Sequence, residues 1–247
     1  MRLKFKVLAA LLAAVTLGSL PARSYKGSSE GQPVDSGSFG IFRQGRRIGT
    51  ETFSIQQRSE ASVITAQLKI EDGNDKASQS SELQVTSNGN LRHYEWKELS
   101  PEKAQATVDY SDQFLVEHIT VAPGAKPQER AFMLPPSTVI LDDFFTHREI
   151  LLWRYMATFC GAAVGPQGCK MQPTKFGVFI PREQTSSIVT LSYEGTDKVM
   201  FHGAERELNR FTLQSDDAAW NLWVEGSSPF KLLRILVPSE NVEVVRD

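Results

Sequence analysis

Alternation between apolar and polar residues is the strongest pattern in the chain, and it predicts β-strands. Between Ile64 and Ile70 every second side chain is apolar. Because successive side chains of a strand point to opposite faces, such a segment has one dry face and one wet face. We expect further strands at Phe39/Ile41, Phe53/Ile55, Leu83/Val85, Tyr94/Trp96, Ala104/Ala106/Val108/Tyr110, Leu115/Ile119/Val121, Phe176/Val178/Ile180, Val189/Leu191/Tyr193, 208–213, Trp220/Leu222/Val224, 230–237 and Val242/Val244.

Short turn signals separate the strands of the first half, and such short connections allow only antiparallel neighbours. Asn88-Gly89 is the strongest of these signals, because both central positions of a type I′ turn need positive φ angles. The others are Gln44-Gly45-Arg46, Asp72-Gly73-Asn74-Asp75, Ser111-Asp112 and Pro123-Gly124.

A helical period interrupts the strands between residues 141 and 159. Apolar residues recur there at spacings of three and four, which predicts one amphipathic helix of about five turns. Asp142 or Asp143 is expected to cap its N-terminus. The apolar stripe comprises Leu141, Phe144, Phe145, Leu151, Leu152, Tyr155, Met156 and Phe159.

The order of these elements, about eight strands, a helix and then five or six strands, predicts a mainly β (α+β) fold. Antiparallel strands with one dry face need a cover, and the helix stripe needs a surface to bury against. A single strongly curved antiparallel sheet, a half-barrel wrapped around the one amphipathic α-helix, satisfies both. No second linker rich in Gly, Ser or Pro divides residues 38–247, so we expect a single domain there.

Residues 1–24 have the parts of a cleavable secretory signal peptide. A cationic start precedes an apolar stretch from Val7 to Leu20, and the small residues Ala22 and Ser24 offer cleavage sites. The apolar stretch is shorter than the ~20 residues needed to span a bilayer, and Pro21 ends it. We therefore expect an exported protein, periplasmic in a Gram-negative cell and otherwise secreted, with no transmembrane segment after cleavage.

Removal of the signal changes the charge of the chain. Residues 25–37 follow it, contain almost no apolar side chains and are expected to form a flexible linker. The signal takes four basic residues with it, leaving 23 basic against 29 acidic residues, a net charge of −6. Such a surface does not attract polyanions, so nucleic acid and anionic membrane surfaces are poor partners.

Cys160 and Cys169 bracket a glycine-rich segment and are expected to form a disulfide in an oxidising compartment. Closing so short a loop stabilises by about 2–3 kcal/mol. A redox site would more often show Cys-x-x-Cys, and a zinc site would need further cysteine or histidine ligands. No cysteine directly follows the signal, so the chain is not expected to be a lipoprotein.

Three segments of the chain, residues 39–51, 141–153 and 222–238, resemble a group of bacterial exported proteins of unknown function. That group shares the lipoprotein-carrier type of half-barrel, the fold of LolA and LolB. The resemblance implies an open β half-barrel whose concave side, in some relatives, holds lipid acyl chains. Architecture does not fix function, and a helix that plugs the cavity permanently stays an alternative.

Small side chains on the predicted concave face, such as Ala77, Ser81 and Ala106, leave a volume that must be filled. Side chains of the helix are the simpler filling, and a ligand is the alternative because one helix is narrow for so wide a sheet. A ligand is expected to contact Phe144, Phe145, Arg148, Leu151, Leu152, Tyr155, Tyr94, Trp96 and Tyr110.

Arg148 lies close to the apolar stripe, where an aliphatic residue would be expected. Its guanidinium either extends to the rim or meets a carboxylate or an anionic headgroup at the mouth of the pocket. Trp220 and Trp223 are three residues apart on a predicted strand, so their side chains should face opposite sides of the sheet.

Motifs that would indicate catalysis or a metal are missing from the sequence. The histidines, His93, His118, His147 and His202, are dispersed and do not have the spacing of metal ligands. The sequence contains no G-x-S-x-G, no phosphate-binding loop and no dinucleotide fingerprint, so no metal and no cofactor are expected.

Three functions remain. The first is an envelope carrier or sensor that binds a lipid or other apolar ligand on the concave face. The second is a plugged half-barrel that acts as a scaffold or protein-interaction module, for which an open sheet offers two edges. The third is a hydrolase whose residues are dispersed along the chain, because a Ser-His-Asp arrangement needs no sequence proximity. A role without catalysis is favoured.

Overall fold

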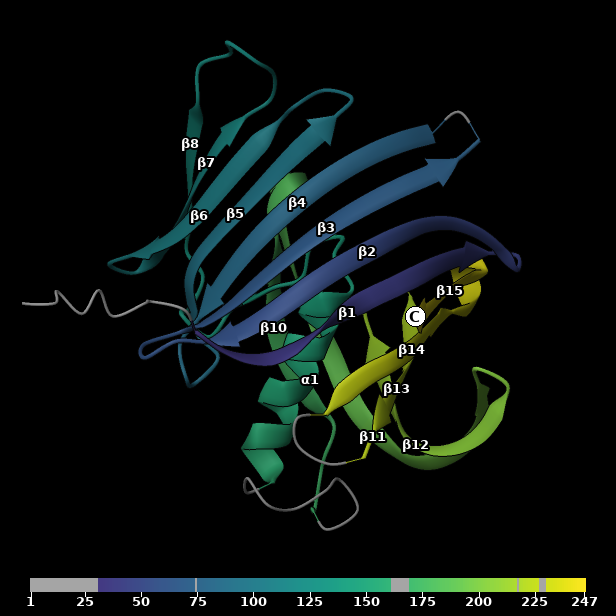
Figure 1. The fold of residues 1–247 in the computed structure, drawn as a ribbon. Helices are drawn as coiled ribbons and strands as arrows, with labels where there is room; N and C mark the ends of the chain where they lie inside the picture. The colour runs from purple at the N-terminus through teal and green to yellow at the C-terminus, as the bar shows by residue number, and fades with distance from the viewer. Residues whose placement is uncertain (1–30, 74, 161–168, 217, 227–229) are drawn as a thin grey trace, which may run out of the picture.

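The computed structural model describes residues 31–73, 75–160, 169–216, 218–226 and 230–247 (Figure 1). The expected signal peptide, residues 1–24, lies outside the described residues, as does segment 25–30 of the expected linker.

Fifteen strands form one sheet in the described residues, and the chain runs through it in two meanders. The spatial order is β8-β7-β6-β5-β4-β3-β2-β1-β15-β14-β13-β12-β11-β10-β9, so β1 and β15 meet inside the sheet. Neighbours are antiparallel except for the short parallel pair of β9 and β10. The strands are β1 (Gln32–Arg43), β2 (Arg46–Gln57), β3 (Ser62–Asp72), β4 (Asp75–Val85), β5 (Leu91–Ser100), β6 (Gln105–Ser111), β7 (Phe114–Thr120), β8 (Gln128–Phe132), β9 (Val139–Ile140), β10 (Thr174–Ile180), β11 (Thr185–Phe201), β12 (Ala204–Gln214), β13 (Ala219–Glu225), β14 (Lys231–Val237) and β15 (Val242–Arg246).

The sheet curves around α1 (Thr146–Phe159), which lies between the two meanders (Figure 1). Fully buried side chains from both meanders, such as Tyr94 and Phe211, form one hydrophobic cluster with Phe144 and Tyr155. The expected fold class is therefore confirmed: a mainly β structure in which one strongly curved sheet packs around one α-helix of the described residues.

The two edges of the sheet meet through side chains, and no backbone pairing joins β8 to β9 in the described residues. Phe132 of β8 packs on Phe179 of β10, with ring centroids 4.6 Å apart. Gln184 follows the short 3₁₀ helix η2 (Pro181–Glu183) and donates from Nε2 to Oε2 of the buried Glu117 at 2.9 Å. The half-barrel is thus held together at its seam by an aromatic contact and a polar one.

Strand β1 begins at Gln32, so residues 32–37 are not the flexible linker that their composition predicts. This segment pairs with β2, starting at the Gln32–Gln57 pair. Asp35 occupies a buried position, where its Oδ1 accepts a hydrogen bond from Nη2 of Arg246 at 2.7 Å. A buried ion pair occupies the position where the alternating pattern of a strand would have an apolar residue. The sequence pattern therefore does not reveal that β1 begins before Ser38.

The helix starts later than expected, and neither Asp142 nor Asp143 caps it. The carboxylate of Glu51 on β2 accepts hydrogen bonds from the backbone N–H groups of Phe145, at 2.6 Å, and Thr146, at 3.0 Å. Asp142 instead accepts the N–H of Asp143 at 2.9 Å. A carboxylate from a strand therefore satisfies the first donors of α1 and lies at the positive end of its dipole.

The first half of α1 is buried on every side, not along one stripe. All residues from Thr146 to Leu152 are buried, and exposed positions begin only at Ala157 and Thr158. With 14 residues, the helix has about four turns. Along its first two turns the helix therefore occupies the space beside the small concave side chains, which is the simpler of the two fillings expected from the sequence.

The turn at Asn88-Gly89 differs from the predicted type I′ turn. Gly89 has a positive φ of 74°, but Asn88 does not share this conformation. The carbonyl of Thr86 accepts the N–H of Gly89, and the N–H of Thr86 donates to Asn90. The turn is one residue longer, with an irregular register beside it. A two-residue turn with positive φ at both positions occurs instead at Gln44-Gly45.

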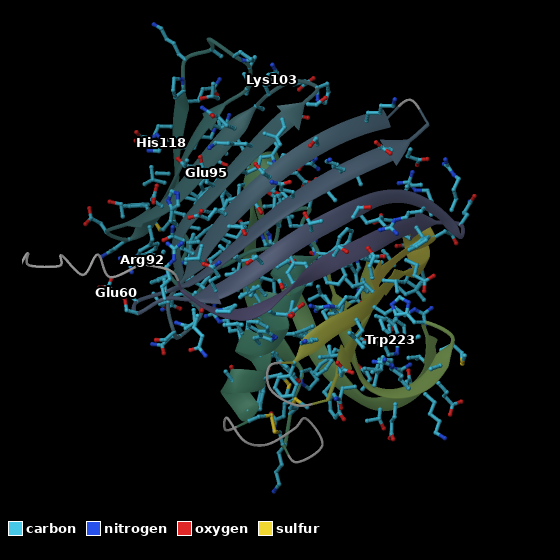
Figure 2. The ribbon with its side chains drawn as sticks, viewed as in Figure 1. Glu60, Arg92, Glu95, Lys103, His118 and Trp223 are labelled. Carbon is cyan, nitrogen blue, oxygen red and sulfur yellow. A yellow bond between two sulfur atoms is a disulfide. The ribbon has the colours of Figure 1, made fainter. Side chains whose placement is uncertain are left out.

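Trp220 and Trp223 face opposite sides of β13, as expected. Trp220 packs against the main cluster, whereas Trp223 belongs to a second cluster with Phe201, Leu208 and Leu233. The hairpin of β11 and β12 carries Phe201 and Leu208 over this outer face, so Trp223, labelled in Figure 2, is only 6% exposed.

Cys160, directly after α1, forms the expected disulfide with Cys169, with Cα atoms 5.5 Å apart. The bond ties the end of the helix to the segment that leads into β10.

Candidate functional site

A cavity of about 900 Å³ lies at one end of the half-barrel, beside the start of α1. This volume is within the range of about 300–1,000 Å³ that is typical of small-molecule sites. The wall comes from β1 to β5, from the segment before the helix and the first turn of α1, from β10 with η2, and from β13 to β15. Its apolar members are Ile41, Ile48, Leu68, Ile70, Ala77, Pro101, Leu141, Phe145, Ile180, Trp220, Val237 and Val242. We call this space the mouth cavity.

Charged side chains surround the opening of the mouth cavity. Arg43 forms an ion pair with Asp72, and Nη1 of Arg182 contacts Oδ2 of Asp143 at 2.7 Å. Lys76 is exposed at the same rim. The cavity therefore combines a largely apolar interior with a charged entrance.

Arg148 places a buried cation in the wall of the mouth cavity. Only 7% of the residue is exposed. Its Nη1 donates to the carbonyl oxygens of Asp142 and Phe144, the latter at 2.7 Å. Its guanidinium lies 4.6 Å from the ring centroid of Trp220, which is cation–π geometry. Nε is buried and has no hydrogen-bond partner among the described residues.

Asp142 and Tyr94 form a second polar contact in this wall. The hydroxyl of Tyr94 donates to Oδ2 of Asp142 at 2.9 Å, and both residues are buried. Burial, together with the nearby Asp143 carboxylate, raises the pKa of Asp142 to about 6. This carboxyl group therefore changes its charge close to neutral pH.

Glu51 and His147 complete the polar groups at the start of the helix. Burial raises the pKa of Glu51, although the N–H groups that it accepts act in the opposite direction. Burial, with the adjacent Arg148 charge, lowers the pKa of His147 to about 3. His147 is thus a neutral ring between Tyr94 and Phe144, with centroid distances of 5.7 and 5.4 Å.

A separate group of buried charged residues lies on another side of α1. It consists of two acids, Glu149 and Asp35, and Arg246, and we call it the Glu149 cluster. Nη1 of Arg246 is 3.7 Å from Oε2 of Glu149. In the described residues, no side-chain or backbone donor forms a well-defined hydrogen bond with either carboxylate oxygen of Glu149. The same is true of Oδ2 of Asp35. Burial and the neighbouring Asp35 carboxylate raise the pKa of Glu149 well above its usual value. A protonated Glu149 that donates to Asp35 explains these observations together.

The residues predicted to contact a ligand separate into two groups. Phe145 and Arg148 line the mouth cavity. Phe144, Leu151, Leu152, Tyr155, Tyr94 and Trp96 are buried in the main cluster, and Tyr110 is partly buried against it. Trp96 donates from Nε1 to Gln79, a residue of the cavity wall, at 3.0 Å. The orientation of α1 determines which of its predicted ligand contacts line the cavity, because the helix directs most of its large side chains into the core.

Sequence reasoning missed Glu51, Asp35 and Arg246 as buried polar groups. A signal for Glu51 exists, because it lies two residues before Phe53 and therefore on the inward face of the same strand. No comparable signal marks the Glu149 cluster, since its members come from β1, α1 and β15.

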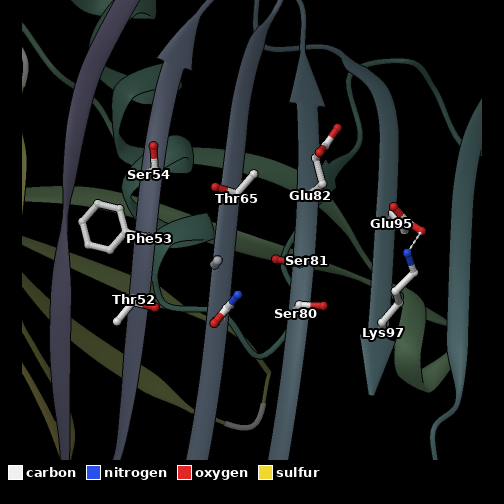
Figure 3. A pocket seen from close by; sticks show the side chains of 11 residues that line it. Thr52, Phe53, Ser54, Thr65, Ser80, Ser81, Glu82, Glu95 and Lys97 are labelled. Atoms are coloured by element: carbon white, nitrogen blue, oxygen red, sulfur yellow. Dashed lines mark ion pairs between the residues drawn. The ribbon is translucent and has the colours of Figure 1, made fainter. Parts of the chain in front are cut away.

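A second hollow, of about 490 Å³, lies over β2 to β5 on the outer face of the sheet (Figure 3). Most of its side chains are short or polar, such as Thr52, Thr65, Ser80 and the ion pair of Lys97 with Glu95 at 2.5 Å, and Phe53 is its one large apolar member. Its volume is about half that of the mouth cavity, and it has fewer large apolar side chains.

The described residues contain no group of three or more His, Cys, Asp or Glu side chains placed to hold a metal ion. Within the same part of the chain, no helix has the length and apolar character needed to cross a membrane. Comparison of the chain with family models, curated proteins and solved structures finds no match.

Proposed function

We propose that the protein binds a lipid or another ligand with an apolar chain in the mouth cavity. The observation that supports this most directly is the cavity itself: about 900 Å³ with a largely apolar lining, next to a helix that already fills the middle of the half-barrel. Apolar surface of this extent gains free energy when a ligand displaces its water, at roughly 25 cal/mol per Å².

Filling the cavity should abolish binding without unfolding the protein. Ala77 on β4 lines the mouth cavity, so the ring in Ala77→Phe would occupy ligand space. We expect uptake of a dansyl-labelled fatty acid, measured by fluorescence titration, to weaken by about tenfold or more. The melting temperature should stay within a few degrees of the original, because the added ring has room.

The matched control is Ser80→Phe, on the outer hollow of the same strand. This variant should bind the probe as the unaltered protein does. Equal binding by Ala77→Phe would place the ligand elsewhere. A lack of uptake by the unaltered protein, with no lipid found in native mass spectra of protein from its own host, would contradict the proposal.

A scaffold role is the second candidate, and the exposed edge of the sheet favours it. Four of the five residues of β8 are exposed, and Met133 directly after this strand is 82% exposed. An edge strand can accept a strand from a partner. Proximity labelling in the cell envelope that recovers no consistent partner would count against this role.

We also propose that the protein acts outside the cytoplasm, because the first 24 residues have signal-peptide character and the cysteines are paired. Expression of the full chain in a Gram-negative host should yield a periplasmic product. Its intact mass should correspond to cleavage after Ala22 or Ser24. An unprocessed mass in the cytoplasmic fraction would contradict export.

A further inference from the structure

We propose that the mouth cavity selects ligands with an anionic headgroup, a carboxylate or a phosphate ester, which binds the guanidinium of Arg148. This inference rests on the proposed function, because it specifies the chemistry of the same ligand. It identifies the class as an anionic amphiphile: an apolar chain against the cavity wall and a charged group at the start of the helix.

The guanidinium of Arg148 retains unused hydrogen-bonding capacity. Both of its hydrogen bonds come from Nη1, and both acceptors are neutral backbone carbonyls, of Asp142 and Phe144. Nε is buried without a partner among the described residues. The edge formed by Nε and Nη2 is one that binds carboxylates and phosphates through two parallel hydrogen bonds. Trp220 lies against the face of the guanidinium at 4.6 Å, so it occupies neither donor of this edge.

Each nearby carboxylate is already engaged by another donor. Glu51 accepts two helix N–H groups, and Asp143 pairs with Arg182 at 2.7 Å. Asp142 accepts from the hydroxyl of Tyr94 and from the N–H of Asp143. These carboxylates act on Arg148 only over a longer range, because no described carboxylate forms an ion pair with its guanidinium within 4.0 Å. A buried charge without a close counter-charge is costly unless a ligand supplies one.

The charge balance of the headgroup site depends on pH. Burial raises the pKa of Asp142 to about 6, so this group becomes neutral in moderate acid. Asp143 is balanced by Arg182, Glu51 has a pKa raised by burial, and His147 stays neutral with a pKa lowered to about 3. Among the buried groups at the start of the helix, Arg148 then keeps its charge without a close counter-charge, while Lys76, Glu183 and Glu240 lie at the rim of the cavity. A headgroup that itself stays anionic in this range, such as a phosphate ester, should therefore bind more tightly at about pH 5 than at about pH 7.5, with a midpoint near the pKa of Asp142.

The test uses the unaltered protein after removal of its signal peptide. The ligands share one alkyl chain and differ in their headgroup. Palmitic acid, hexadecyl phosphate, hexadecanol and methyl palmitate would each compete with the bound dansyl fatty acid. We expect the two anions to bind about tenfold or more tightly than the two neutral compounds, because a charge-assisted, bidentate contact is lost in the latter. Inorganic phosphate alone should compete weakly, since it lacks the apolar chain.

Variants of Arg148 give a second measurement. Arg148→Lys keeps the charge but not the two-donor edge, and it should reduce the preference for anions over hexadecanol. Arg148→Met should remove the preference. Because Nη1 also binds the segment before the helix, the thermal stability of each variant is measured, and the ratio of anion to alcohol affinity is the readout. Arg154→Lys on the same helix, outside the mouth cavity, should leave that ratio unchanged.

The outcomes separate this inference from the proposed function. Equal affinity for palmitic acid and hexadecanol would overturn the anionic headgroup while the apolar site remained. Binding of none of the chain compounds would overturn both. Inorganic phosphate that competes as well as hexadecyl phosphate would show a site for free anions and would overturn the amphiphile.

Discussion

Replacement of Glu51 with leucine is expected to lower the free energy of unfolding by about 3 kcal/mol or more. Leucine has a similar size, but it leaves the N–H groups of Phe145 and Thr146 buried without an acceptor. Each unsatisfied buried donor costs about 1–3 kcal/mol, and the favourable placement of a carboxylate at the helix N-terminus is lost as well. The measurement is urea denaturation followed by far-UV circular dichroism at neutral pH.

Two further variants serve as a graded comparison and a control for Glu51→Leu. Glu51→Gln retains one acceptor oxygen and should lose roughly half as much stability. Thr52→Ala, at the exposed neighbouring position, should change the free energy of unfolding by less than about 0.5 kcal/mol. If Glu51→Leu were as stable as the unaltered protein, a carboxylate cap on α1 would be untenable.

Glu149→Gln is expected to raise the free energy of unfolding at neutral pH, whereas Glu51→Leu lowers it. Burial raises the pKa of Glu149 in the folded state well above its ordinary value near 4.5. The folded protein then holds a proton that the unfolded chain releases, so this group lowers stability as the pH rises above 4.5. The loss is at most about 1.4 kcal/mol per pH unit until the folded pKa is reached.

Glutamine keeps a donor for Asp35 and has no proton to lose. At about pH 4.5 the variant and the unaltered protein should be similar, and the variant should become progressively more stable than the unaltered protein as the pH rises toward 7. Other groups also titrate: the charges that face the cluster are Asp35 on β1, Arg246 on β15 and Lys231 on β14. The difference between the two proteins isolates Glu149.

Chemical denaturation across this pH range measures the effect. Glu60→Gln is a suitable control because the Glu60 side chain is 73% exposed, and its effect should stay below about 0.5 kcal/mol at every pH. A marked destabilisation by Glu149→Gln at pH 7 would show that Glu149 is ionised and paired with Arg246.

Most of the fold follows from local sequence patterns, because hairpins need only alternation and turn residues. The apolar positions of β3, for example, pair directly with β2 and β4 through short turns. The pairing of β1 with β15 is different, since no local signal specifies contact between strands this distant in the sequence. The sequence also could not predict that β1 begins at Gln32, because the burial of Asp35 depends on its ion pair with Arg246 of the distant strand β15.

The candidate site was less predictable than the fold. Arg148 was recognisable as a charge close to an apolar stripe, and the structure places it in the cavity wall. The same reasoning could not separate Phe145, which lines the cavity, from Phe144, which is fully buried. That difference depends on where the helix begins, and Glu51, a residue of another element, provides the cap there.

The pairing of β1 with β15 also sets an order on folding. Ser38 and Asp247, which are hydrogen-bonded, are 209 residues apart in sequence. The meander of β1 to β8 can form early from neighbouring hairpins, but its strand β1 remains an open edge until β15 has been synthesised. Contacts of such high sequence separation slow folding. The β1 edge therefore stays unpaired, and open to other strands, until the distal part of the chain is available.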